Sequence, residues 1–180
     1  MICITHTKTV ILFLSKEVSK VLLDSRQEKL YTKLQTDIIK DKFSNKEKYK
    51  VYADNTHMYI IHNNCCIYSL EKQYIYLDCD KLGTVEPTQV LYNIINTDNI
   101  ECEAFVTNEM IKYNKSNLIK FTNNQNNINC YYDYKYIKDL ELETKSYKCY
   151  FKEFQGEQKI LSICTNNKDK FITLTPVKIY

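Results

Sequence analysis

The chain has 180 residues and a net charge of +3, with 44% apolar and 13% aromatic residues. A chain of this length and composition can bury a core of its own, which excludes an intrinsically disordered protein. The small positive charge neither requires nor excludes a nucleic-acid partner. Lys, Asn, Ile and Tyr are abundant while Gly, Pro and Trp are scarce, and this bias indicates an AT-rich genome, for example a viral one.

The apolar runs of the sequence are short. The longest, residues 10–14, is far below the roughly 20 residues that span a membrane. The N-terminus also lacks the pattern of a signal peptide. We therefore expect an intracellular protein with no membrane partner. Its 8 cysteines are then expected to be free thiols in the core, because none forms the CxxC pair that is typical of a zinc site.

The first half of the chain predicts a helix, then a segment of ambiguous type, and then strands. Residues 8–14 fit a strand or the lead-in to a helix over 15–24, capped by Ser15. Residues 26–48 fit either a helix or a strand. Short β-branched and aromatic runs, separated by Asx-rich turns, then predict four strands. These strands cover residues 49–53, 58–62, 66–70 and 73–79.

The second half predicts one more helix and a series of strands. Pro87 suits the first turn of a helix that ends at Ile95. Its apolar residues Val90, Leu91, Ile94 and Ile95 predict a buried stripe. Strands are expected over residues 100–107, 110–113, 118–122, 129–136 and 147–151, a short helix over 156–164, and a closing strand over 171–180. Pro176 predicts an edge position for that last strand.

Together these elements predict an α+β fold: an antiparallel, β-rich domain with short helices packed on one face of the sheet. Their order, and several short motifs within them, resemble the sliding clamps of the proliferating cell nuclear antigen type. Residues 53–58, ADNTHM, are similar to the Met-Asp-Ser-Ser-His-Val turn of that family. Tyr76, Cys79-Asp80 and Gly83 resemble its Tyr-x-Cys-Asp…Gly stretch. Residues 132–134 and 139–141 resemble the strand and the acidic start of the connector between its two domains.

The resemblance covers roughly residues 9–175 and implies a clamp-like domain over 1–143, with a partial second clamp-like domain or extension over 144–180. It implies an oligomeric ring around duplex DNA, with lysines that contact phosphates without reading sequence. Lys16, Lys20 and Lys159 occupy the matching positions. Ordinary solvent-exposed helix lysines remain the alternative interpretation.

The family also holds replication and repair proteins, which insert a short peptide into an apolar pocket. By match, His57 and Met58 would line one wall of that pocket, with Leu140 and Leu142 nearby. A histidine that only hydrogen-bonds within its turn is the alternative for His57. The implied location is the nucleus or a viral replication site.

The chain also departs from the family. The helix over 87–95 has no Lys or Arg, and the chain is too short for two full domains. It therefore fits a ring closed by more subunits or by a second polypeptide, as a homo- or hetero-oligomer, or a clamp-derived scaffold that does not encircle DNA. No motif points to an enzyme, a metal or a cofactor. The competing interpretation is an intracellular viral or parasite β-rich module that binds a host protein through its many tyrosines.

Overall fold

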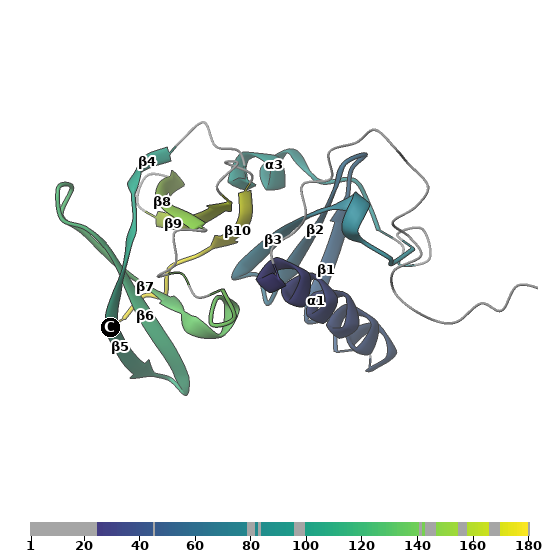
Figure 1. The fold of residues 1–180 in the computed structure, drawn as a ribbon, viewed down its shortest axis with the longest axis horizontal. Helices are drawn as coiled ribbons and strands as arrows, with labels where there is room; N and C mark the ends of the chain where they lie inside the picture. The colour runs from purple at the N-terminus through teal and green to yellow at the C-terminus, as the bar shows by residue number, and fades with distance from the viewer. Residues whose placement is uncertain are drawn as a thin grey trace, which may run out of the picture.

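The computed structural model describes residues 25–44, 46–78, 82, 84–95, 100–140, 142, 147–154, 158–165 and 170–179. It confirms the α+β class: the strands are antiparallel and the helices lie outside the sheets (Figure 1). No helix among these residues is long and apolar enough to cross a membrane. The expected strand and helix over residues 8–24 lie outside the described residues.

Helix α1 resolves the ambiguous segment of the sequence. It spans Ser25–Ser44 and buries one face against the sheet. Its apolar residues Leu30, Leu34 and Ile38 recur at four-residue spacing, so they share that face. Tyr31 adds a stacked contact with Phe171, with 5.8 Å between the ring centroids.

The described residues include ten strands, which form two sheets. The seven-stranded sheet has the order β1-β2-β3-β10-β9-β8-β4, and the three-stranded sheet the order β5-β6-β7. The first sheet comprises β1 Tyr49–Ala53, β2 His57–His62, β3 Cys66–Glu71, β4 Ile100–Glu103, β8 Tyr147–Phe154, β9 Gln158–Thr165 and β10 Lys170–Leu174. The second comprises β5 Phe105–Tyr113, β6 Ser116–Asn123 and β7 Ile128–Asp133. Strands from both sides of the predicted boundary between residues 143 and 144 share the larger sheet, because β10 pairs with β3 and β8 pairs with β4.

The two described α-helices lie over opposite faces of the larger sheet. Residues of β2 alternate between the faces. Met58 and Ile60 belong to the main core with α1, whereas Tyr59 packs with Leu91 of helix α3, Gln89–Ile95. The expected placement of the helices on one face is therefore not what the structure has.

Two predicted elements are wrong, and a third is a strand at a different position in the sheet. Residues 73–79 do not form a strand: a 3-10 turn, η2 Lys72–Tyr74, follows β3, and the backbone N–H of Tyr76 donates to the side chain of Gln35 on α1. Both edges of β3 are already paired with β2 and β10, so this segment cannot pair with β3 as a hairpin strand would. The helix expected over residues 156–164 is the internal strand β9. The closing strand is found as β10, but it is internal rather than at an edge and ends before Pro176.

Strand β9 was predicted to be a helix because the strand is buried on both faces. Residues 160–164 are all at most 2% exposed. A strand that is buried on both sides has a continuous apolar run without alternation, and such a run has no strand signature.

Candidate functional site: an apolar pocket beside helix α3

Helix α3 is short and starts at a side-chain cap. The Thr88 hydroxyl accepts a hydrogen bond from the backbone N–H of Leu91 at 3.3 Å, as an N-cap residue does. Leu91 is the one buried residue of α3, and it packs against Tyr59 and Ile67 of the sheet. The predicted stripe is therefore only partly buried: Ile94 is half-buried and Val90 is 62% exposed.

Asp54 lies in the turn between β1 and β2, and its side chain links this turn to helix α3 by hydrogen bonds. One carboxylate oxygen accepts hydrogen bonds from the backbone N–H groups of Thr56 and His57, at 2.7 and 2.8 Å. The other accepts from the hydroxyls of Tyr59, at 2.8 Å, and of Tyr92 on α3, at 3.2 Å. Burial raises the pKa of Asp54, but the hydrogen bonds outweigh it and hold that pKa well below its usual value. The carboxylate is thus charged and links the turn to the helix.

Lys152 holds the other end of α3. This β8 lysine is 1% exposed, and its ammonium donates to the carbonyls of Asn93 and Ile94, at 2.8 and 3.1 Å. Carbonyls in the last turn of a helix lack partners within the helix, and a cation there also interacts favourably with the helix dipole. A buried lysine therefore takes the place of a C-cap.

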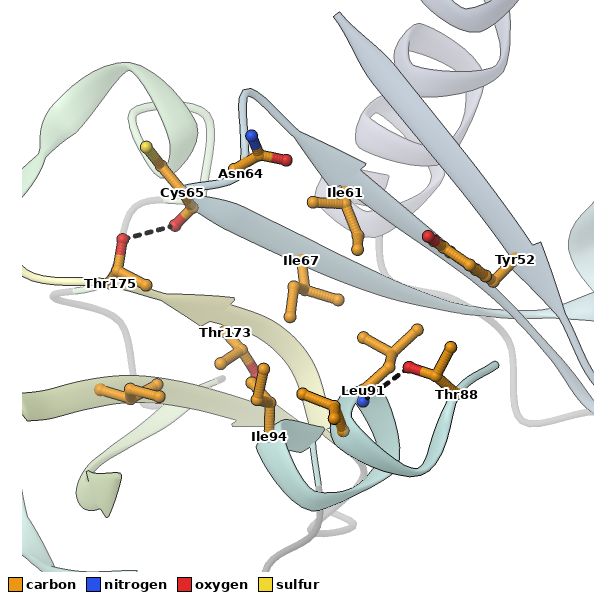
Figure 2. Close-up of a pocket in the computed structure, with 12 residues that line it drawn as sticks. Tyr52, Ile61, Asn64, Cys65, Ile67, Thr88, Leu91, Ile94, Thr173 and Thr175 are labelled. Carbon is orange, nitrogen blue, oxygen red and sulfur yellow. Dashed lines mark hydrogen bonds between the residues drawn. The ribbon is translucent and has the colours of Figure 1, made fainter. Parts of the chain in front are cut away.

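Between α3 and the sheet lies a pocket of about 230 Å³ (Figure 2). Its lining is mostly apolar, with hydroxyl, amide and thiol groups among the polar members. The lining residues are Tyr52, Ile61, Asn64, Cys65, Ile67, Thr88, Val90, Leu91, Ile94, Ile160, Thr173 and Thr175. The pocket is smaller than the roughly 300–1,000 Å³ typical of drug-sized ligands. A space of this size and lining can hold an apolar side chain.

Cysteine chemistry adds little to this pocket. Cys65 is exposed, and its carbonyl accepts a hydrogen bond from Thr175. Cys66, Cys149 and Cys164 are buried free thiols, as expected for packing residues. Burial raises the pKa of Cys149 to about 12, so this thiol stays protonated and unreactive at neutral pH.

The residues expected to form a partner pocket do not form an exposed one. Met58 and Leu140 are both 0% exposed within the main core, and Leu142 packs against that core. His57 precedes Met58 on β2 and faces the opposite side, where its ring stacks on Tyr59. Its Nδ1 lies 2.8 Å from the Thr56 hydroxyl, so it has the contacts of a turn histidine.

Of the predicted DNA-facing lysines, Lys159 lies among the residues that the structure describes. Lys159 lies on strand β9 rather than on a helix, and its ammonium pairs with Glu101 at 2.6 Å and with Glu153 at 3.9 Å. Two carboxylates beside one ammonium leave no net positive charge for a phosphate. Lys16 and Lys20 lie outside the described residues.

Sequence reasoning missed the α3 pocket, although a signal was present. Residues 89–95, QVLYNII, carry no charge and place apolar groups on more than one side of the helix. A short helix of this kind cannot bury all its apolar groups against one sheet face, so some remain exposed.

No group of three potential metal ligands occurs in the part of the chain that the structure describes. Comparison with protein-family models, with curated proteins and with solved structures found no match for the chain.

Proposed function

We propose that this protein is a clamp-derived scaffold that binds a partner protein rather than an enzyme. The observation that carries the proposal is the apolar pocket beside α3, with the exposed side chain of Val90 in its lining. An apolar anchor inside a pocket, surrounded by polar groups, is the usual form of an interaction hot spot. The collinear clamp-like motifs of the sequence favour replication or repair proteins as partners, in the nucleus or at a viral replication site.

The scaffold version is preferred to a DNA-encircling ring because of where the helices lie. In a ring of the clamp type, helices share one surface that lines the pore. Here α1 and α3 cover opposite faces of one sheet, and α3 has no basic residue. A partner-binding role needs neither a pore nor a second complete domain.

The test is binding of a fluorescein-labelled clamp-binding peptide, measured by fluorescence anisotropy. We expect Val90→Asp to weaken binding by about tenfold or more, because it places a charge in the apolar lining. Val85→Asp is the matched control: Val85 is 59% exposed, lies five residues earlier, and is not part of the pocket lining.

Equal effects of the two variants would rule out the pocket as the peptide site. If the wild-type protein does not bind the peptide at all, the clamp part of the proposal is wrong. A different partner class, such as the host protein of the alternative interpretation, would then have to be considered.

A second candidate function, non-specific binding of duplex DNA, is favoured by the outward face of α1. Arg26, Lys29, Lys33 and Lys40 follow at i, i+3, i+7 and i+14, so they lie on one side of the helix. That side lies away from the buried face, and Lys29, Lys33 and Lys40 are exposed. Lys33 shares its charge with Asp139, at 2.8 Å, and one carboxylate, Asp37 at i+11, lies on the same side. Such a basic stripe suits contacts with phosphates.

Salt-dependent DNA binding tests this candidate. We expect Lys29→Glu with Lys40→Glu to weaken binding of a 20-base-pair duplex and to reduce the salt slope by about 2, one for each phosphate that a lysine no longer neutralises. Lys112→Glu with Lys115→Glu changes the same charge at the exposed β5–β6 turn and serves as the control. Equal weakening in both double variants would show that only net charge matters, and would count against a site on α1.

A further inference from the structure

The two sheets end in four edge strands, β1, β4, β5 and β7, and these differ in how their outer edges are covered. On the outer side of β1, the backbone N–H of Ala53 donates to the carbonyl of Val85. On the outer side of β7, the N–H of Val177 donates to the carbonyl of Tyr131. Strand β4 has only 4 residues. Strand β5 has 9 residues, and among the described residues it pairs with β6 alone, so it is the longest open edge.

The turn after β5 fixes the direction of the backbone groups along this edge. Asn114 and Lys115 have φ of 45° and 68°, as the two central residues of a type I′ hairpin turn do. The flanking residues Tyr113 and Ser116 face each other and are the pair that this turn joins by hydrogen bonds. From this point, hydrogen-bonded and non-hydrogen-bonded pairs alternate along the antiparallel ladder.

Met110 and Lys112 therefore direct their backbone N–H and C=O groups away from β6. Ile111, which lies opposite Leu118, exchanges its hydrogen bonds with β6 instead. No hydrogen bond joins the outward backbone groups of Met110 and Lys112 to another residue that the structure describes. Both side chains are exposed as well. This edge thus offers two N–H donors and two carbonyl acceptors to an incoming strand.

We propose that β5 pairs with β5 of a second copy of this chain, antiparallel and about a two-fold axis that passes through Ile111. In a two-fold dimer each contact occurs twice, and residues whose backbone points outward must face each other. An axis at Ile111 places Met110 opposite the partner's Lys112, and Lys112 opposite the partner's Met110. Both pairs exchange two backbone hydrogen bonds, which gives four across the dimer.

The other symmetric pairings of these outward residues are less favourable. An axis at Lys112 places this lysine opposite its own copy, and like charges directly opposite each other are destabilising. An axis at Met110 aligns one outward pair instead of two. The axis at Ile111 puts no like charges opposite each other, and it brings the two isoleucines together in a non-hydrogen-bonded pair, where side chains lie closest. The edge of β5 is therefore complementary to itself in this register.

The contact involves few residues, fewer than a standard interface of roughly 1,600 Å² requires, so we expect a weak dimer with a Kd of roughly 0.1 mM. The proposal does not rest on the function assigned to the α3 pocket. That pocket lies on the larger sheet, whereas β5 belongs to the smaller one. A dimer of this kind carries two α3 pockets, which would let it bind a bivalent partner more tightly than a monomer does.

Sedimentation equilibrium of the full chain over a range of concentrations tests the pairing. Met110→Lys creates two like-charge pairs across the axis, and we expect it to weaken dimerisation about tenfold. Adding Lys112→Glu turns both into opposite-charge pairs and should restore dimerisation. The control combines Met110→Lys with Lys148→Glu, which has the same net charge but changes an exposed residue of β8, a strand paired on both edges. This control should not restore dimerisation.

A second pair of variants tests the backbone contact. Lys112→Pro removes an outward N–H that β6 does not use, and proline is tolerated at such a position of an edge strand. We expect it to weaken dimerisation at least about tenfold, because two of the four hydrogen bonds are lost. Lys112→Ala removes the same side chain but keeps the N–H, and it is the matched control. Circular dichroism and urea denaturation of each variant show whether the monomer keeps its fold.

The proposal is overturned if the wild-type chain remains monomeric at about 1 mM. It is also overturned if the two double variants dimerise equally, because net charge and not the register would then decide association. Equal dimerisation of folded Lys112→Pro and Lys112→Ala would show that the copies meet elsewhere than at the β5 edge.

Discussion

Helices α1 and α3 cover opposite faces of the same β-strands, yet they are held there in different ways. Helix α1 has 20 residues, seven of them buried, including Leu30, Leu34 and Ile38. Helix α3 has 7 residues, and Leu91 is the one that is buried. Hydrophobic stabilisation grows with buried apolar area, so α1 gains far more from packing than α3 does.

Polar contacts compensate for the small buried area of α3. The hydroxyl of Tyr92 donates to Asp54, and Lys152 donates to two carbonyls in the last turn. A helix held by a few polar contacts opens at lower cost than one held by a broad apolar face. The pocket proposed for partner binding therefore lies beside the more easily adjusted of the two helices.

Alanine substitutions in the two helices test most directly whether α1 gains more stability from packing than α3 does. Leu34→Ala removes a side chain that is 3% exposed in the main core, and we expect a loss of about 3–5 kcal/mol in the free energy of unfolding. Leu91→Ala should cost less, about 2 kcal/mol, because its space adjoins an existing pocket. Urea denaturation measures both. A larger loss for Leu91→Ala would reverse the assignment of α1 as the better-held helix.

A smaller effect is expected from removing the buried ammonium. Lys152→Met keeps a long unbranched side chain but leaves the two carbonyls without this donor, and we expect a cost of about 1–3 kcal/mol. Hydrogen exchange should rise first in residues 89–95, before the rest of the fold. Lys148→Met, at an exposed position of the same strand, is the control. Unchanged exchange in α3 would mean that Lys152 does not hold it.

Much of the first sheet could be predicted from local sequence. The strands over residues 49–71 are short, rich in β-branched and aromatic residues, and separated by Asn and Asp turns; Asn63 and Asn64 indeed have φ of 50° and 57°. These signals depend only on neighbouring residues. The burial of β9 on both faces, and the internal position of β10, depend on distant partners, and both were misread.

The candidate site shows the same division. The sequence shows that α3 carries no charge, and it predicts a helix there. The pocket itself needs Ile61 and Ile67 from one part of the chain and Ile160 and Thr173 from another. Lys152 is 58 residues beyond Ile94, whose carbonyl it binds. No local pattern in the sequence predicts that contact.

The sequence by itself determined the α+β class, the turns of the first three strands and the uncharged nature of α3, because each follows from propensity and short-range spacing. Only the tertiary structure decided that the helices lie on opposite faces, that Met58 and Leu140 are core residues, and that Val90 is exposed beside a pocket. The reason is that a residue is buried only when another segment packs against it. Which face of each element is covered depends on the strand order, and the strand order depends on contacts between residues far apart in the chain.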